Sequence, residues 1–538
     1  MTESDGTALR RTMIAVVFGG LMSMLDATIV NIAIRTLSVR LHVPLSSVQW
    51  VVTGYLLALA AVIPVAGWIA ARFGPRRVYA WSIAAFTLAS AACGLSTSAG
   101  ELIAFRVIQG AAGALTLPVG SMILARVAGR ERMAKAMGII GIPTVLAPVF
   151  GPVVGGLLLE HAGWQWIFFV NVPIGLVAVP LALWLLPRDT PSRPGRPDLL
   201  GLALASAGMA LATYGLASAG GSAGRVVAPL VAGVVLLAAF VIRSARIARP
   251  LLDVRLYTNR AYAAASLTTF AMGGAIFGAM ILMPLYYQLI RHQDPVLTGL
   301  LVAPTGAGAA VAMLVSARLT DRFGSGLTAL AGGLIAAAAT VPFTLIGPST
   351  PYVWLSLSMV ARGIGVGLCL VPAMTAAYRA VPPDRISDGT VQLNVLNRLG
   401  GSVATAVFTV VLQHGLNAHG LNAHGLSVSG LNAHGLSVSG SFGTAFRWAL
   451  GAAVLGSVSA VVLARVESRA KSRAPASAAV RTVAAPATSI STSLTPPATF
   501  TPSAVSTPPV VSATTGTPDP GDAPVLAGDD LGAAATSS

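Results

Sequence analysis

Long apolar runs separated by short polar intervals make up most of this chain. Each run has about 20 apolar residues, which is enough to cross a hydrocarbon core of ~30 Å as one α-helix. The pattern predicts an all-α integral membrane protein with 14 transmembrane helices. Their expected ranges are 13–34, 48–70, 78–98, 101–124, 134–159, 165–187, 199–219, 226–243, 261–289, 297–317, 327–347, 352–375, 390–412 and 443–464.

The composition agrees with a chain that folds in lipid. Its 538 residues are 55% hydrophobic and 10% charged, with a mean hydropathy of +0.77, whereas soluble domains carry about 25% charged residues. A short polar lead with Arg10 and Arg11 precedes the first run, and no small-residue cleavage site follows it. We therefore expect a retained first helix and not a signal peptide.

The basic residues orient the chain. The net charge is +16, and of 34 Lys and Arg residues we place 26 in alternate loops and the two ends, 5 in the opposite loops and 3 within spans. The positive-inside rule assigns the basic side to the cytoplasm, with both termini there. This placement accounts for the charge without a nucleic-acid partner and predicts a multi-pass protein of the cell (inner or plasma) membrane.

The spans divide into groups of six, two and six, because basic segments follow the sixth and the eighth. The expected parts are a cytoplasmic N-terminus at 1–11, a six-helix bundle at 12–187, two linker helices with basic flanks at 188–260, a second six-helix bundle at 261–464 and a disordered cytoplasmic tail at 465–538.

Within the second bundle, the loop 413–442 repeats short units of His, Gly, Leu and Ser. Near-identical tandem units are typical of a tolerant exposed loop. We expect no metal site there.

The two bundles share a loop sequence. Residues 67–74 read GWIAARFG and residues 317–324 read ARLTDRFG, at an offset of 250 residues. Each segment follows the second helix of its bundle. Two related halves are a signature of transporters.

One carboxylate lies deep in an apolar run. Asp26 has no basic residue within one helical turn, while the other 17 acidic residues fall near span ends, in loops or in the terminal segments. A carboxylate in low dielectric is costly to keep ionised, so Asp26 is a candidate proton site. The alternative is an aspartate that fixes helix packing, through Thr28 or Asn31.

Two further spans carry unusual patterns. Residues 106–113 read RVIQGAAG, and positions 106, 109, 110 and 113 share one helical face. Residues 147–156 read APVFGPVVGG, where small residues at four-residue steps allow close helix contact and two prolines bend the helix.

These segments, with LDATIVNIA at 25–33, resemble the major facilitator superfamily, and within it the fourteen-helix drug:proton antiporters of the multidrug and quaternary-ammonium efflux type. The resemblance covers residues 12–464. It implies the major facilitator fold and proton coupling through Asp26. Arg106 keeps its proton, so its expected role is electrostatic, with Asp26 as its suggested partner. The alternative is an arginine that satisfies backbone carbonyls.

The resemblance also implies residues of the substrate cavity and of the cytoplasmic gating loops. The cavity and helix-packing residues are Asn31, Gln109, Gly110, Gly113, Pro148, Gly151, Pro152, Gly155, Gly156, Arg362 and Arg398. The gating residues are Gly67, Arg72, Gly74, Arg76, Arg77, Asp321, Arg322 and Gly324.

Three of these assignments stay open. The family pattern has aspartate where Ala71 stands, so a charge-based latch is expected at Asp321 with Arg322 instead. Arg72, Arg76 and Arg77 could be plain topology determinants. Arg362 and Arg398 either are satisfied internally or line the cavity.

The sequence contains no phosphate-cradling lysine loop, no nucleophile elbow and no catalytic constellation. We expect a transporter and not an enzyme, with no cofactor beyond a proton gradient. The expected partners are a small amphipathic substrate, protons and the lipid bilayer, and the expected state is a monomer. The predicted function is proton-coupled export of amphipathic drugs, antibiotics or related metabolites by alternating access, with a preference for neutral, monocationic or zwitterionic compounds. The alternatives are a nutrient importer or facilitator, and a non-transporting sensor.

Overall fold

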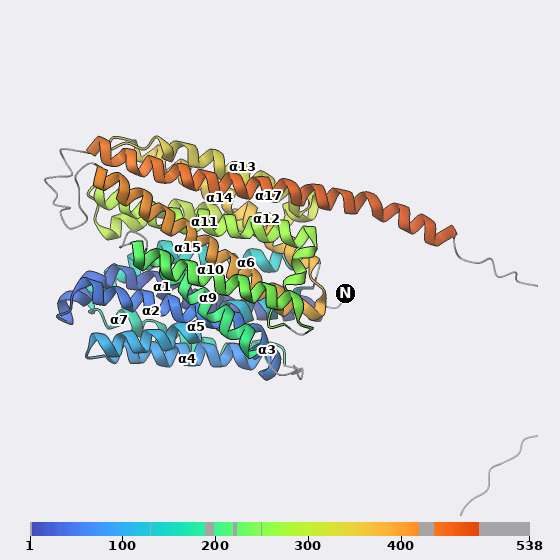
Figure 1. Ribbon diagram of the computed structural model, residues 1–538, viewed down its shortest axis with the longest axis horizontal. Helices are drawn as coiled ribbons and strands as arrows, with labels where there is room; N and C mark the ends of the chain where they lie inside the picture. The colour runs from blue at the N-terminus through green and yellow to red at the C-terminus, as the bar shows by residue number, and fades with distance from the viewer. Residues whose placement is uncertain are drawn as a thin grey trace, which may run out of the picture. The chain divides into compact units, whose positions relative to one another are not determined.

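The computed structural model describes residues 3–129, 131–188, 198–218, 223–248, 250–418 and 435–483. Helices account for nearly all of these residues, and most of them lie roughly parallel to one another (Figure 1). The described residues up to Ala478 form one compact unit. The all-α prediction is confirmed for the described part of the chain.

The first half of the chain supplies one group of helices. They are α1 (Glu3–Arg40), α2 (Leu45–Val62), the 3₁₀ turn η1 (Ile63–Val65), α3 (Ala66–Phe73), α4 (Pro75–Leu95), α5 (Ala99–Ala128), α6 (Met133–His161), α7 (Trp166–Phe169) and α8 (Asn171–Leu185). Pro64 lacks a backbone donor, and the predicted span 48–70 is divided at this residue into α2 and α3.

The second half supplies a matching group, which lies above the first in Figure 1. It comprises α11 (Arg260–Leu289), α12 (Pro295–Phe323), α13 (Ser325–Thr344), α14 (Tyr352–Ala380), the turn η3 (Pro383–Arg385), α15 (Ile386–Ala418) and α17 (Gly435–Val483). The repeat loop therefore begins and ends within helices, and its centre, 419–434, lies outside the described residues.

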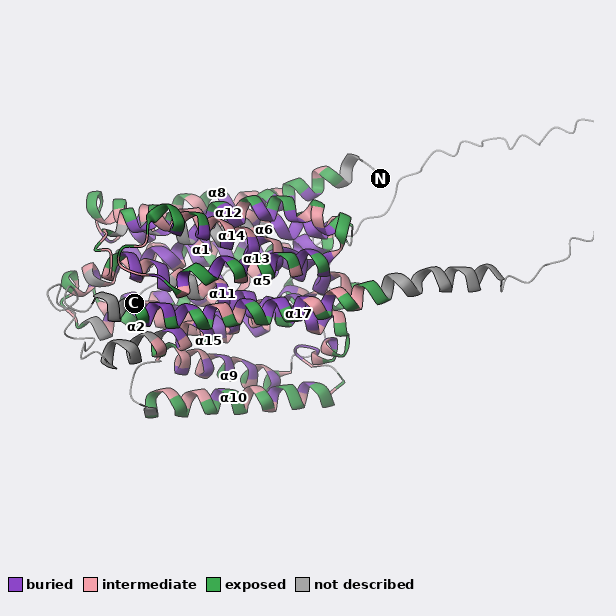
Figure 2. Ribbon diagram, turned by 90° about the horizontal axis from the view of Figure 1, so that it is seen from above, coloured by how far each residue is buried: buried purple, intermediate pink, exposed green. Residues whose placement is uncertain are grey.

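Two helices connect the halves. These are α9 (Leu199–Ala217) and α10 (Ala223–Arg246), followed by the turn η2 (Val254–Thr258). Helix α9 packs against α2 and α15, while α10 packs mainly against α9 and lies at the edge of the molecule with much of its surface exposed (Figure 2).

Twelve helical segments of the described chain are long and apolar enough to cross a membrane. The two remaining predicted spans, 134–159 and 390–412, fall on α6 and α15, which are helical over 29 and 33 residues. The protein is therefore a multi-pass membrane protein.

The prediction of a disordered tail at 465–538 is wrong for residues 465–483. Helix α17 continues to Val483, so residues 465–483 are helical. This segment is rich in Ala and Arg, which are strong helix formers. The rest of the predicted tail, 484–538, lies outside the described residues.

The two similar loops have the same backbone shape. Gly74 has φ 93° and Gly324 has φ 92°, and each ends one helix and starts the next. This left-handed conformation favours glycine. The internal similarity seen in the sequence thus corresponds to a repeated turn.

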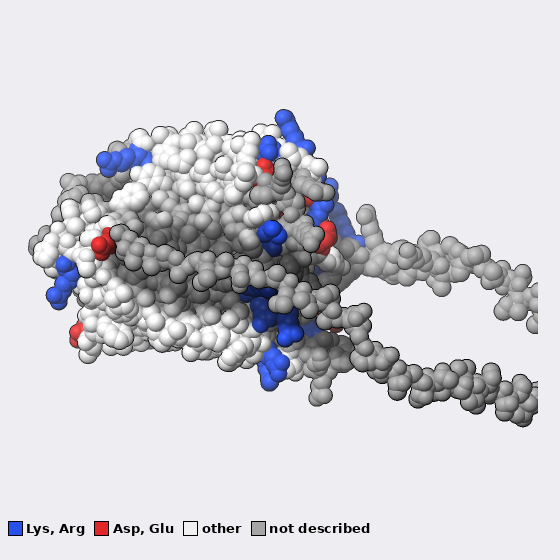
Figure 3. Space-filling view, turned by 90° about the horizontal axis from the view of Figure 1, so that it is seen from below, with Lys and Arg blue, Asp and Glu red and all other residues white. Residues whose placement is uncertain are grey.

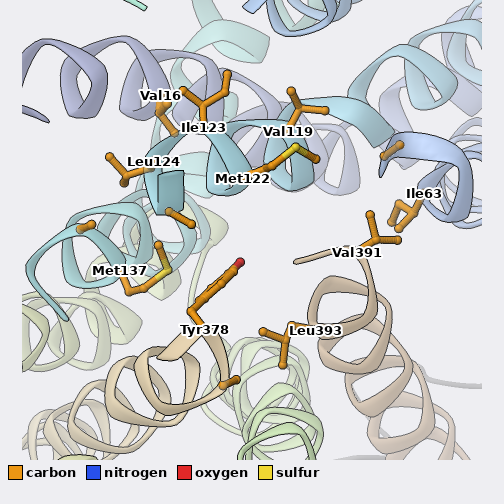
Figure 4. Close-up of a cluster of buried hydrophobic side chains, with 14 of the residues drawn as sticks. Val16, Ile63, Val119, Met122, Ile123, Leu124, Met137, Tyr378, Val391 and Leu393 are labelled. Carbon is orange, nitrogen blue, oxygen red and sulfur yellow. The ribbon is translucent and has the colours of Figure 1, made fainter. Parts of the chain in front are cut away.

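The two halves meet along α5 and α6 on one side and α12, α14 and α15 on the other. Figure 4 shows this seam, where Met122 and Met137 face Tyr378 and Leu393. Close to Met122, Arg126 Nη2 of α5 donates to Ser387 Oγ of α15 at 3.1 Å. Most of the basic residues visible in Figure 3 also gather toward one end of the molecule.

Candidate functional site

Asp26 lies in the middle of α1 and is completely buried, with 0% of its surface exposed. Its Oδ2 accepts a hydrogen bond from Arg106 Nη1 of α5 at 2.7 Å, and the guanidinium is 1% exposed. A charge-assisted bond of this length is strong. The suggested pairing of Asp26 with Arg106 is present in the structure.

Two amides complete the surroundings of the carboxylate. Gln109 Nε2 donates to Asp26 Oδ1 at 3.0 Å, and Asn171 Nδ2 of α8 donates to the same oxygen at 2.9 Å. Arg106 Nη1 also donates to Gln109 Oε1 at 2.7 Å. Asp26 therefore receives three hydrogen bonds from side chains of two other helices.

Arg106 is held on every side. Its Nε donates to the Val51 carbonyl at 3.1 Å, and its guanidinium lies 4.1 Å from the centre of the Tyr55 ring. The Phe168 ring lies further away, at 5.8 Å. Burial of a cation is costly unless its donors are satisfied, and these contacts provide that satisfaction from α2 and α7.

A second layer of contacts fixes Asn171. Its Nδ2 also donates to Ser90 Oγ at 3.0 Å, and Ser90 Oγ donates to the Phe168 carbonyl at 2.9 Å. The network thus joins α1, α2, α4, α5, α7 and α8. A change in the charge of Asp26 would therefore act on several helices at once.

Small residues bring the helices of this network together. A side chain at Gly110 would collide with the Tyr55 carbonyl, and one at Gly113 would lie 3.1 Å from Phe86. The approach of α5 to α2 places Arg106 over the Tyr55 ring. The predicted packing role of the two glycines agrees with this geometry.

The glycine stripe of α6 packs against α1. A side chain at Gly151 would collide with Thr28, one at Gly155 would approach Ile29, and Gly156 lies beside Val296 of α12. Thr28 Oγ1 donates to the carbonyls of Leu25 and Ala147 at 2.9 and 3.1 Å. Thr28 therefore joins α1 to α6 and has no hydrogen bond to Asp26 among the described contacts.

A cavity of about 330 Å³ lies beside the network. Its wall is mainly apolar and comes from α1 and α2 of the first half, α11 and α15 of the second half, and α9. Tyr55, Arg106 and Arg398 contribute polar groups to it. Arg106 therefore contacts Asp26 and the cavity at the same time.

The other two arginines within the spans have different positions. Arg362 of α14 is 4% exposed and donates to the Ala275 carbonyl of α11, so it lies between these two helices. Arg398 of α15 lines the cavity and also a smaller one of about 60 Å³ next to it.

The gating residues lie away from this site. Asp321 pairs with Arg379 of α14 at 3.4 Å, while Arg322 stacks on Phe323. Among the loop residues of the first half, Arg72 stacks on Phe73 and Arg76 donates to the Leu183 carbonyl.

Gly67 packs against the start of α15 and does not contact Asp26. A side chain on it would lie 3.5 Å from Val391 and 3.7 Å from the Ser387 carbonyl. The side chains of Asn31, Pro148 and Pro152 lie outside the described part of the structure.

Sequence reasoning missed three residues of the network: Tyr55, Ser90 and Asn171. Asn171 stands in an aromatic segment, 164–175, that resembles an interfacial belt. The available signal was a buried amide inside an apolar span, which requires a hydrogen-bond partner. Nothing in the local sequence indicates that this partner is Asp26.

Comparison with known proteins gives a consistent result. The sequence profile described as Major Facilitator Superfamily matches residues 16–405. A protein of Mycobacterium tuberculosis named "Multidrug resistance protein B homolog" is 39% identical over 416 residues, covering 76% of this chain and 77% of that protein. The "Methylenomycin A resistance protein" of Streptomyces coelicolor is 32% identical, covering 74% of this chain and 84% of that protein.

A solved structure is similar in fold. A proton:xylose symporter of the major facilitator superfamily superimposes with a TM-score of 0.55 at 12% identity, covering 83% of this chain and 95% of that one. At this level of identity the likeness concerns the fold alone.

Proposed function

Because this chain belongs to the major facilitator superfamily, and is therefore a transporter and not an enzyme, we propose that it is a proton-coupled exporter of small amphipathic compounds. We further infer 14 spans with both termini in the cytoplasm, two of the spans being α9 and α10. The proton gradient supplies the driving force, and the functional unit is a monomer.

The position of Arg106 is the observation that carries the coupling. Its guanidinium binds Asp26 at 2.7 Å and also forms part of the cavity wall. Protonation of Asp26 removes one charge of a buried pair and leaves Arg106 unbalanced, so the electrostatics of the cavity change. Proton binding and substrate binding are thus linked through one side chain.

The place of the cavity supports alternating access. Its walls come from both halves, so a relative movement of the halves changes which side of the membrane it faces. At the end of the seam near Arg126 and Ser387 the two halves are in contact. The names of the relatives, which refer to drug resistance, support export as the direction.

Asp26→Asn tests the coupling. In vesicles with purified protein, the wild-type chain should move an amphipathic compound when a pH gradient is imposed, and the variant should lose this pH-driven flux because Asn cannot take up a proton. Asp26→Glu keeps a carboxyl group and should retain part of it. Gel filtration checks that both variants are folded.

Glu131→Gln is the control, because Glu131 is an exposed carboxylate in the loop before α6. It should leave the flux unchanged. Full pH-driven flux in Asp26→Asn would exclude Asp26 as the proton site, and flux only toward the vesicle side that corresponds to the cytoplasm would identify an importer.

A further inference from the structure

The charges inside the spans do not balance. Among the acidic residues that the structure describes, only Asp26 lies deep in a span, whereas Arg106, Arg362 and Arg398 all lie within spans. Asp26 is already paired with Arg106. The described part of the chain therefore offers no further intramembrane carboxylate to the other two arginines.

The two remaining arginines, Arg362 and Arg398, have different surroundings. Arg362 is buried between α14 and α11, where the Ala275 carbonyl accepts from it, and it lines neither of the two cavities described above. Arg398 lies at the boundary of both cavities, and no hydrogen bond or ion pair joins it to another residue in the described part of the chain. Its guanidinium is therefore available to interact with a compound that occupies the cavity.

The surrounding wall makes this charge effective. Phe277, Met24 and Leu399 lie in the lining beside Arg398, and such apolar walls strengthen electrostatic interactions because they exclude water. Arg398 and Arg106 both lie within electrostatic range of Tyr55, so the two cations act on the same space. With the Asp26–Arg106 pair neutral, the cavity carries one net positive charge.

We propose that Arg398 determines the specificity of this cavity: it binds the acidic group of an amphipathic compound and repels permanent cations. This inference rests on the proposed export activity and names its substrate class. It differs from the quaternary-ammonium class that the family resemblance implies. An anion on Arg398 offsets a buried cation, whereas a second cation adds like-charge repulsion in a low dielectric.

Equilibrium binding tests the proposal without any driving force. Three probes share one apolar body and differ in the charge of the polar group: para-butylbenzoate, para-butylbenzamide and para-butylphenyl-trimethylammonium. Titration calorimetry on the purified full-length protein at pH 7.5, where the benzoate is ionised, should rank them benzoate first, amide second and ammonium last. An ammonium compound that binds as tightly as the benzoate would overturn the proposal.

Variants of Arg398 then locate the effect. Arg398→Gln should weaken benzoate binding by roughly tenfold to a hundredfold, the range of a hydrogen bond to a charged group, and should bring the ammonium compound close to the amide. Arg398→Lys should keep the ranking. Arg225→Gln, on the exposed face of α10, removes the same charge outside the cavity and should change nothing.

Unchanged benzoate affinity in a folded Arg398→Gln protein would also overturn the proposal, and the ranking on the wild-type protein decides the matter if that variant does not fold. Flux of the same probes in vesicles tests the proposed export activity separately from the proposed role of Arg398. Binding of the benzoate with no flux of any probe contradicts the export activity alone. Flux with no dependence of affinity on charge contradicts the role of Arg398 alone.

Discussion

At the scale of single residues, three side chains donate hydrogen bonds to the Asp26 carboxylate. Two of them, Gln109 and Asn171, are neutral amides that share one oxygen, while Arg106 binds the other. Removing Arg106 would leave a buried charge without its partner, which costs about 3–5 kcal/mol of folding free energy. Removing one amide is milder and changes mainly the balance between the protonated and ionised forms.

Asn171→Leu tests the balance between the protonated and the ionised form of Asp26. The variant loses one hydrogen bond to a carboxylate, worth about 1.5–3 kcal/mol, so protonation of the carboxyl group becomes easier. The pH at which proton-driven flux is half-maximal should move upward, as measured in vesicles over a series of pH values. Gln293→Leu, in a polar loop outside the network, is the control and should leave the dependence of flux on pH unchanged. The same dependence in Asn171→Leu as in the wild-type protein would show that the Asn171 amide only supports packing.

The sequence could identify Asp26 because a charge in an apolar run is visible without any structure. Gln109 was identified because it shares a helical face with Arg106. Asn171 and Tyr55 could not be placed, because their contacts with the pair depend on how α8 and α2 pack against α1 and α5. Such contacts are set by tertiary structure, which no local pattern records.

At the scale of elements, the start of α15 is tied to the segment that leads into α11. Asp253 pairs with Arg385, its carbonyl accepts from Gln392 Nε2 at 2.9 Å, and its backbone N–H donates to Asp388. Asp388 lies two residues before the predicted span 390–412. Burial, with the nearby Asp253 carboxylate, raises the pKa of Asp388 to about 6.

This raised pKa gives a pH dependence with a definite sign. The folded protein holds the Asp388 proton more tightly than the unfolded chain, so the contribution of this group is favourable at low pH and is lost as the pH rises toward 6. Asp388→Asn should therefore raise the melting temperature at pH 7.5, because it adds at most about 3 kcal/mol to the free energy of unfolding at that pH. At pH 4 it should have little effect. Thermal unfolding in detergent measures both.

Asp384→Asn is the matched control for that measurement. Asp384 stands four residues earlier and is largely exposed, with 76% of its side chain accessible. Its carboxylate makes only the weakest contribution to the raised pKa of Asp388, so Asp384→Asn should change the melting temperature at pH 7.5 far less than Asp388→Asn does. A lower melting temperature for Asp388→Asn at pH 7.5 would show that the ionised carboxylate stabilises the fold.

At the scale of the whole molecule, the two halves contact each other at the end of the seam where α15 begins. Ser387 of α15 is 9% exposed and contacts both Arg126 and Met122 of α5. The sequence anticipated two halves from the repeated loop, but it could not show where they touch. That depends on pairs such as Arg126 and Ser387, which are 261 residues apart.

Ser387→Arg should separate the halves at this end, because it places a second cation next to Arg126. Met122→Cys is the reporter, since Met122 is fully buried in the seam. Labelling of this cysteine by a water-soluble maleimide should be slow alone and several times faster with Ser387→Arg. Ser387→Ala should leave the rate low, and equal rates in all three proteins would mean that this contact does not close the seam.

Helix α9 has a consequence for how compounds reach the cavity. It packs on α2 and α15 and contributes Met209, Thr213 and Leu216 to the cavity wall. On that flank the cavity is therefore screened from the acyl chains of the bilayer by a protein helix. A compound dissolved in the membrane can therefore pass between α2 and α15 only if α9 moves away from them, so α9 is a lateral barrier on this flank of the cavity.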